Sequence, residues 1–552
     1  MFIPSFVIPD EAVAPIGYKL TNSLRFNGTN SRIATATMTA SNNPKKWTWN
    51  GWVKRGKLSV AENLFGNGLT SSGSQALVRL MFLTDDVIQF YMRNSSGVSQ
   101  AEYRTVGKFR DTSAFYNIGI AYDSAQANAD DRFKMYINGV ELVKGTQLTV
   151  ANPVDLDATP PAPFDTLRML GAQNTGAAYS AYLDGVISGA CFVDGQALVP
   201  DGNFGEFDTN GRFVPIDPTG VITDFGKNGS RLLFNNGTSL ATLGYDSAPI
   251  NGAHASLNNW TIVNLTAADA QLFSSPSTNF ATGNPQAVAA SGGVGVWSFG
   301  QLTLTLNSTT KWGSSNIALK DQPVYSEFTC QSGVGSTAAT LVTIGVLEQV
   351  GNSWMVAAGY TSDGKKVVND VSSAFAVAYA TGDIIGVAVN PVTKKVTFYK
   401  KTGIAARVLV GEVDYSAVTI TGPLFIGADS GTTAGARVLH ANFGQLPPAT
   451  AAPDGYGLLK PAGEVVIKSG SLTGNFNVNG PFIFMNGTPE TFSVDTGSGL
   501  IPVPTTSYDK LANGVKIRVS TGPNVSGTHA WEATVLSPES KSAFINRNAQ
   551  MN

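Results

Sequence analysis

Acidic residues that stand close together are the first candidates for chemistry in this sequence. A glycosidase needs two carboxyl groups roughly 5 to 10 Å apart, flanking the bond that it cleaves. Three neighbouring pairs could supply them: Asp85 with Asp86, Asp130 with Asp131, and Glu206 with Asp208. Each pair lies near Gly, Asn or Ser, where aspartate is favoured because its side chain hydrogen-bonds the backbone of a turn. We therefore interpret these carboxylates as turn residues and predict no catalytic residue and no enzymatic activity.

Three aspartates could instead bind a metal ion. Asp123, Asp130 and Asp131 flank a loop before a predicted strand, and carboxylate oxygens are the ligands that Ca²⁺ prefers. Their spacing does not match that of an EF-hand loop. We therefore predict no metal ion and no cofactor, and we name these three aspartates as the ligands if Ca²⁺ binds.

The histidines and cysteines do not indicate a metal cluster or a catalytic dyad, because no two of them are near in the sequence. The histidines are His254, His440 and His529, and His440 lies in a strand-like segment where we expect a structural role. Cys191 and Cys330 lie in apolar strand-like segments, which predicts two buried free thiols and no disulfide framework.

No other motif points to catalysis. The sequence has no G-x-S-x-G elbow, no phosphate loop and no paired C-x-x-C. The segment GVGVWSFG (293–300) has closely spaced glycines but lacks the spacing and the following helix of a phosphate loop. Loops rich in Asn, Ser, Thr, Gly, Tyr and Trp suit recognition of sugars or proteins. We expect Trp297, Trp312 and Trp354 themselves to lie in the core.

The composition restricts the class of protein. The chain has 552 residues, too many for one core, so we expect about three domains. Only 14% of the residues are charged and the net charge is −2, which argues against nucleic acid as a partner. A hydrophobic fraction of 43% argues against disorder. We expect no membrane span, because no apolar run reaches about 18 residues, and the first ten residues do not form a convincing signal peptide.

Strands rather than helices must position the functional residues. Trp47, Trp49 and Val53 alternate with polar residues, which predicts a half-buried strand, with Trp52 just off this register. Asn138-Gly139 lies between two alternating runs and predicts a hairpin, because both turn positions need positive φ. Strands recur about every 8 to 12 residues along the chain, which is typical of all-β sandwiches.

The strand pattern divides the chain into four parts. An apolar arm (1–22) precedes a first sandwich (23–247), a second sandwich (248–460) and a small C-terminal β domain (461–552). We expect the segment NNWTIVNL (258–265) to open the second sandwich. The C-terminal domain should contain strands within 465–470, 480–487, 516–521 and 529–536.

The first sandwich resembles the laminin-G-like, concanavalin-A-like domain of bacteriophage virion proteins. The resemblance covers most of residues 22 to 247, and includes the run WTWNGWVKRGKL that starts at Trp47. It is most specific at Asp194–Leu198, Phe204–Glu206 and Val214–Pro215. It implies an antiparallel jelly roll with a binding role.

The second sandwich is similar to SPRY-type domains, which often follow such a domain in phage proteins. The segments Gly382–Val387 and Ala441–Gln445 carry the similarity best. An aromatic-rich strand common in that family is represented only by Val324–Phe328, so no ligand groove is carried over. The C-terminal domain resembles no family that we can name.

The two resemblances imply a phage structural protein. The first hypothesis is a tail fibre or spike in the virion that binds a host surface receptor, a glycan or a protein, through loops at one end of a sandwich. A homotrimer in contact with other virion proteins would gain from multivalency. The alternatives are an assembly component, such as a head fibre, decoration or baseplate protein, and a glycan depolymerase.

Overall fold

The computed structural model describes residues 18–459 with short gaps, and the strands beyond residue 465. The gaps lie at 21, 36–37, 68–75, 162–163, 165–166, 177, 209–211, 236–238, 250–257, 267–268, 272–273, 278, 286, 288–292, 308–311, 431–434, 447 and 450–451. Leu20–Ala452 and Leu458–Pro461 form one compact unit, and the C-terminal strands belong to a second unit. Most of the predicted N-terminal arm and His254 lie outside the described residues. No helix in the described part is long and apolar enough to cross a membrane.

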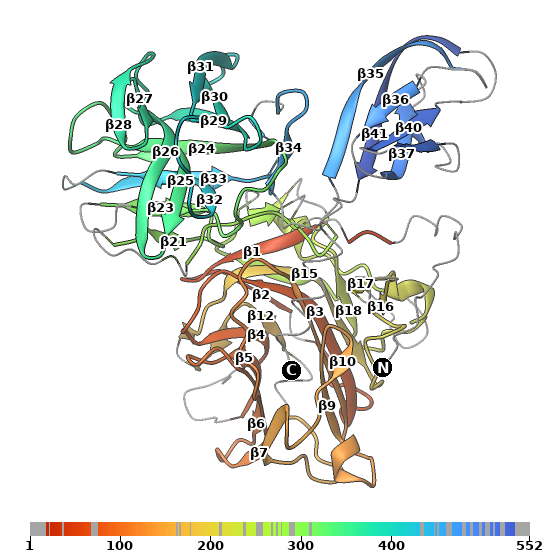
Figure 1. The fold of residues 1–552 in the computed structure, drawn as a ribbon. Coiled ribbons are helices and arrows are strands. Elements are labelled where there is room, and N and C mark those ends of the chain that lie inside the picture. Colours follow the sequence, from red (N-terminus) through yellow and green to blue (C-terminus); the bar gives the residue numbers. More distant parts are fainter. Residues whose placement is uncertain are drawn as a thin grey trace, which may run out of the picture. The chain divides into compact units, whose positions relative to one another are not determined.

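The first sandwich consists of two antiparallel sheets (Figure 1). One sheet has the order β10 (Val140–Glu141), β9 (Phe133–Ile137), β8 (Tyr116–Asp123), β3 (Lys46–Arg55), β15 (Asp184–Asp194), β1 (Ser23–Asn27) and β20 (Ala270–Gln271), with β18 (Ser230–Leu232) beside β15. The other has the order β11 (Leu148–Asn152), β7 (Ser99–Thr105), β6 (Ile88–Arg93), β5 (Leu77–Phe82), β4 (Glu62–Gly66), β12 (Met169–Leu170), β2 (Arg32–Thr35) and β19 (Trp260–Val263).

Short elements decorate the first sandwich. They are the hairpin β13 (Gln173–Asn174) with β14 (Tyr179–Ser180), the hairpin β16 (Gly205–Phe207) with β17 (Phe213–Pro215), the turns η1 (Ala129–Asp131) and η2 (Pro218–Gly220), and the helix α2 (Leu240–Leu243).

Strand β3 is buried on both faces, so the expected half-buried strand is corrected. Trp47, Trp49 and Val53 face the core between the sheets, as their alternation predicts. Trp52 faces the other side and stacks on Phe213 of β17, at 5.8 Å between ring centroids. The segment that follows β15 thus covers the outer face of β3, and a sequence pattern does not reveal such a cover because its residues lie far along the chain.

The hairpin predicted at Asn138-Gly139 is confirmed. Asn138 and Gly139 have φ of 49° and 79°, and they join β9 to β10, where Ile137 pairs with Val140. Positive φ at both positions is the signature of the two-residue turn that fits the twist of a hairpin.

We expect the Gly139→Ala variant to lower the free energy of unfolding of the first sandwich by ~1–3 kcal/mol. The added Cβ would be strained at φ +79° and would lie 2.4 Å from the ring of Phe213. Urea denaturation followed by tryptophan fluorescence measures the loss. The control is Gly145→Ala, because Gly145 has φ +82° but nothing lies within 4 Å of its added Cβ. Equal losses in the two variants would contradict a steric contribution from Phe213.

The second sandwich also has two antiparallel sheets. One has the order β21 (Val296–Ser298), β22 (Thr303–Leu306), β33 (Arg437–Asn442), β24 (Val324–Ser332), β29 (Asp383–Asn390), β30 (Lys395–Thr402) and β31 (Val408–Asp414). The other has the order β23 (Trp312–Ser314), β32 (Leu424–Asp429), β25 (Thr343–Val350), β26 (Ser353–Thr361), β27 (Lys365–Val368) and β28 (Val371–Ala374). The short strand β34 (Gly457–Leu458) follows them in the chain.

The segment expected to open the second sandwich belongs to the first. Strand β19 pairs with β2, with Trp260 opposite Thr35, and β20 pairs with β1. Trp260 is also part of the first core. The first sandwich therefore continues past residue 247, the boundary that we expected, because its two sheets take their last strands from residues 260–271.

The C-terminal unit contains the strands that the sequence predicts. They form one sheet in the order β35 (Val466–Phe476), β41 (Val525–Val535), β37 (Pro489–Asp495) and β38 (Leu500–Pro502), and another in the order β36 (Phe482–Met485), β40 (Gly514–Arg518) and β39 (Tyr508–Leu511). All described sheets are antiparallel, so the predicted all-β class of tandem sandwiches with a small C-terminal β domain is confirmed.

Buried polar contacts join the two sandwiches. The Nζ of Lys54, on the outer face of β3, donates to the Oδ1 of Asn279 at 2.6 Å and to the carbonyl of Phe280 at 2.5 Å. The backbone N–H of Gly300 donates to the Oδ1 of Asp184 at 2.8 Å. Because each contact is buried and pairs groups from both sides, the junction holds the sandwiches in a defined arrangement.

Candidate functional site

Asp86 is buried, and its carboxylate joins three separate segments by hydrogen bonds. Its carboxylate accepts hydrogen bonds from the backbone N–H of Ser59 at 2.7 Å, from Nη1 of Arg55 at 3.0 Å and from Nε of Arg110 at 2.8 Å. The neighbouring Asp85 is exposed. These two carboxylates therefore do not face a common cleft in the way that a glycosidase requires.

The remaining acidic pairs lie at the surface. Asp130 and Asp131 lie in the turn η1, and Glu206 is exposed on β16. Asp208 forms an ion pair with Arg212 at 2.7 Å. None of these residues lines the pocket described below.

The three aspartates named as calcium ligands contact lysines in the structure. The ion pairs are Asp123 with Lys46 at 2.9 Å, Asp131 with Lys134 at 3.1 Å and Asp130 with Lys144 at 3.8 Å. Within the described residues, no three His, Cys, Asp or Glu side chains gather in a group that could hold a metal ion. A calcium ion at these aspartates would have to displace the lysine ammonium groups.

Cys191 and Cys330 are buried, and His440 is partly buried. Cys191 and Cys330 are free thiols, as predicted, and burial raises the pKa of each to about 12. Burial also lowers the pKa of His440 to about 4, and its Nδ1 lies 3.3 Å from the hydroxyl of Thr303. The thiols therefore stay protonated and the imidazole stays neutral near pH 7.

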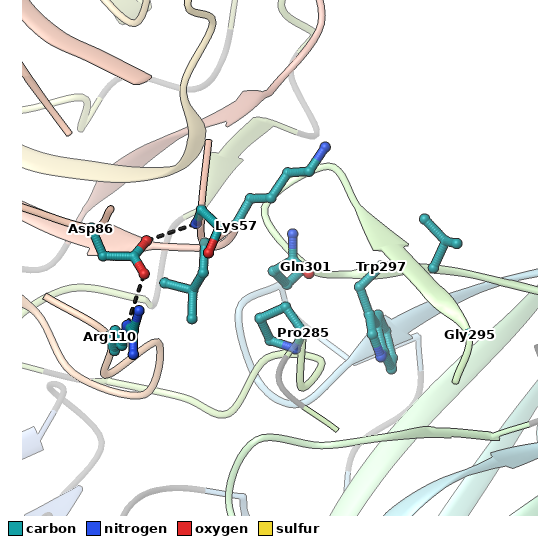
Figure 2. Close-up of a pocket in the computed structure, with 10 residues that line it drawn as sticks. Lys57, Asp86, Arg110, Pro285, Gly295, Trp297 and Gln301 are labelled. Carbon is teal, nitrogen blue, oxygen red and sulfur yellow. Dashed lines mark hydrogen bonds and ion pairs between the residues drawn. The ribbon is translucent and has the colours of Figure 1, made fainter. Parts of the chain in front are cut away.

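A pocket of about 500 Å³ lies where the two sandwiches meet (Figure 2). The first sandwich contributes the loop after β3, the loop between β5 and β6, and the loop between β7 and β8. The second sandwich contributes strand β21 and residues on either side of it. The lining residues are Lys57, Leu58, Ser59, Asp86, Arg110, Pro285, Gly295, Val296, Trp297 and Gln301. In the view of Figure 2, Asp86 and Arg110 lie on one side, Trp297 on the other, and Gln301 between them.

A strained turn places Gln301 in the pocket. Phe299, Gly300 and Gln301 have φ of 54°, 64° and 61°, three consecutive residues in the left-handed region. The turn is held where Gly300 donates to Asp184 of the first sandwich. Strain of this kind costs about 1–3 kcal/mol per non-glycine residue, and it concentrates at functional sites.

A buried cluster of charged residues lies behind Asp86, on the side of the pocket that the first sandwich forms. Arg55 is fully buried and bridges Asp86 at 3.0 Å and Glu62 at 3.3 Å. Burial raises the pKa of Glu62 to about 8, despite the opposing attraction of Arg55. Burial also raises the pKa of Asp184 to about 6, and the hydrogen bond from Gly300 only partly offsets this.

The pocket holds buried polar groups that have no hydrogen-bond partner in the part of the chain that the structure describes. Gln301 is 0% exposed, and among the described residues neither its Oε1 nor its Nε2 has a hydrogen-bond partner. The amide of Gln301 lies beside the carboxyl of Asp184 and offsets part of the rise in pKa that burial causes there, but the two groups do not form a hydrogen bond. The Nε1 of Trp297, itself 6% exposed, also lacks a partner within the described residues. A buried polar atom without a partner costs about 1–3 kcal/mol, which a ligand could recover.

Reasoning from the sequence missed this pocket. The segment 293–300 lacks a phosphate-loop motif, as stated above, yet it supplies Gly295, Val296 and Trp297 to the lining. Trp297 also belongs to the second core, so its predicted core position is confirmed. The sequence signal that could have indicated the pocket is the Gly300-Gln301 step after Trp297. No feature of the neighbouring sequence indicates that this step lies near Lys57 or Asp86.

The comparisons with known proteins show similarity to sandwich domains. No protein-family model matches the sequence, and no curated protein matches it. A heptameric SAP-like pentraxin from Limulus polyphemus is 12% identical, with 33% of this chain and 79% of that chain covered and a TM-score of 0.25. The CBM40 domain of a Ruminococcus gnavus IT-sialidase is 12% identical, with 31% and 91% covered and a TM-score of 0.22. The SPRY domain of human HERC1 is 12% identical, with 26% and 91% covered and a TM-score of 0.20. At these values the case for a function depends on the residues of this chain.

Proposed function

We propose that this protein binds a cell-surface glycan without cleaving it, and that it does so in the pocket between the two sandwiches. The observation that carries the proposal is the buried amide of Gln301, which has no hydrogen-bond partner among the described residues and lies in a pocket with an apolar wall. Sites for small molecules combine such walls with a few fixed polar groups, and they measure about 300–1,000 Å³. Leu58, Pro285 and Trp297 supply the apolar wall.

The pocket supports binding better than hydrolysis. Hydrolysis of a glycosidic bond uses two carboxyl groups, one as acid and one as base or nucleophile. Asp86 is the carboxylate among the described lining residues, and three protein donors already bond it. We therefore propose a receptor-binding role and no catalytic residue.

We further propose that the protein acts on a phage particle, as a tail fibre or spike that attaches to the host. The support is the resemblance around Asp194–Leu198 and Gly382–Val387, and the pairing of two sandwiches in one compact unit. A homotrimer held by other virion proteins would multiply a weak sugar contact, since linked sites gain avidity. Immunogold electron microscopy of intact particles tests the location, and label on the head would overturn the tail assignment.

A specific observation favours a role in virion assembly as the second candidate. The outer strands β28 and β31 expose aliphatic side chains, including Val371 at 68% and Leu409 at 65%. Exposed strand edges with apolar residues invite pairing with another chain. Under this alternative the sandwiches hold neighbouring virion proteins, and antibody against the protein would leave adsorption to the host unchanged.

Replacing Gln301 with methionine is expected to weaken glycan binding about tenfold while the protein stays folded. Methionine keeps the volume and removes the hydrogen-bonding groups, and a lost hydrogen bond in a binding site is worth about 0.5–1.5 kcal/mol, or more where the ligand group is charged. Binding of the full chain to host polysaccharide is measured by calorimetry. Unchanged affinity would place the site elsewhere.

The matched control is Gln445→Met. Gln445 is also buried, but its amide bonds the N–H of Phe443 at 2.9 Å and the carbonyl of Ala281. This variant should therefore lose stability and keep its glycan affinity at temperatures where it is folded, which is the opposite pattern to that of Gln301→Met.

A further inference from the structure

The buried pocket groups that have no hydrogen-bond partner among the described residues are mostly donors. Nε2 of Gln301 and Nε1 of Trp297 can donate, and Oε1 of Gln301 is the acceptor among these buried groups. Lys57 adds an exposed ammonium group with three donors. A ligand that satisfies this set must carry more acceptors than donors at the contact.

Asp86 does not supply the hydrogen-bond acceptors that the pocket lacks. Sites for neutral sugars need acceptors for the hydroxyl hydrogens, and a carboxylate would be the strongest acceptor here. Both oxygens of Asp86 already accept from Ser59, Arg55 and Arg110. The pocket therefore offers a neutral sugar few places for its hydroxyl hydrogens.

The charges around the pocket favour an anion. Arg55 and Arg110 share the negative charge of Asp86. The raised pKa of Glu62, caused by burial, leaves that side chain largely protonated near pH 7. No ion pair of Lys57 occurs with the described acidic residues, although the buried Asp184 balances part of its charge at longer range. Positive charge on Lys57 is thus available to a ligand.

We propose that the pocket binds an acidic sugar, with its carboxylate at Lys57, Nε2 of Gln301 and Nε1 of Trp297. The sugar ring lies against Leu58 and Pro285, and a hydroxyl donates to Oε1 of Gln301. This inference rests on the proposed glycan-binding function and narrows it to one class of ligand. Charge-assisted hydrogen bonds of this kind are about twice as strong as neutral ones.

The test compares acidic oligosaccharides with the same molecules after reduction of the carboxyl group to an alcohol. Oligogalacturonate, hyaluronan fragments and oligosialic acid are titrated into the full chain by calorimetry, each beside its reduced form. At least one acidic probe should bind, and its reduced form should bind at least tenfold more weakly. The affinity should also fall as salt is raised, because part of the attraction is electrostatic.

Two lysine variants test whether Lys57 contacts the carboxylate of the sugar. Lys57→Gln should weaken binding of the acidic probe about tenfold and leave binding of the reduced form unchanged. Lys320→Gln, at an exposed lysine of the second sandwich outside the pocket, should have no effect. Equal binding of acidic and reduced forms, or no effect of Lys57→Gln, would overturn the acidic-sugar inference and leave glycan binding standing. If neither these probes nor host polysaccharide bind, the proposed function fails as well.

Discussion

Replacing Arg55 with methionine is expected to lower the free energy of unfolding of the first sandwich by about 3–5 kcal/mol. Arg55 is fully buried and donates to Asp86 at 3.0 Å, to Glu62 at 3.3 Å and to the carbonyl of Phe109 at 2.9 Å. Methionine fills much of the same volume but leaves these buried acceptors without their donor. Removal of one partner from a buried pair is costly because the other charge stays desolvated.

Urea denaturation followed by tryptophan fluorescence measures this loss, because Trp47 and Trp49 lie in the core of the first sandwich. The matched control is Arg104→Met. The guanidinium of Arg104 pairs with Glu102 at 2.8 Å, but its side chain is 48% exposed, and exposed pairs contribute about 0–1 kcal/mol. A loss for Arg55→Met no larger than that for Arg104→Met would show that the buried cluster does not stabilise the sandwich.

The stability of the first sandwich is expected to fall as the pH rises from about 5 to 8. Burial raises the pKa of Glu62 to about 8 and that of Asp184 to about 6. In this range the folded state keeps protons that the unfolded state has released, so ionisation favours unfolding. The contribution of Glu62 is therefore full below its ordinary pKa of 4.5 and is lost as the pH passes about 8.

Asp86 has the opposite effect at low pH. Burial alone would raise its pKa, but hydrogen bonds from Ser59, Arg110 and Arg55 outweigh it and hold the pKa below the ordinary value of 3.8. Its stabilising contribution is present above that value and is lost as the pH falls below it. We therefore expect the unfolding midpoint in urea to be highest between about pH 4 and 5.

The Glu62→Gln variant tests the source of this pH dependence. An amide keeps the shape of the side chain but does not ionise, so the decline between pH 6 and 8 should become shallower. Glu412→Gln is the control, because Glu412 forms an ion pair with Lys395 in which both side chains are more than 40% exposed. An unchanged slope in Glu62→Gln would show that another group causes the decline.

Much of the fold could be predicted because strands leave local marks. Trp47, Trp49 and Val53 alternate as a core strand requires, and the Asn138-Gly139 step marks its hairpin by backbone conformation alone. The segment 258–265 shows the limit. Its alternation predicts a strand correctly, but a strand of this pattern can complete either sandwich. In the structure it pairs with the edge strand β2 of the first sandwich.

The candidate site could not be predicted in the same way. Lys57 and Gln301 are far apart in the sequence, and the loop at Lys57 carries no motif that names the second sandwich as its partner. Gln301 is polar and follows a glycine, a pattern that is typical of an exposed turn. In the structure it is completely buried beside Gly300, which bonds Asp184 of the first sandwich, and its amide has no partner among the described residues.

The sequence by itself thus determined the all-β class, most strands and the burial of the aromatic run at Trp47. These depend on side-chain periodicity and on backbone preferences, which act between neighbours in the chain. The tertiary structure alone decided which strand completes which sheet, how both faces of β3 are covered, and that Gln301, Trp297 and Lys57 share one pocket. Those outcomes depend on desolvation and contact between distant segments, and no local pattern encodes them.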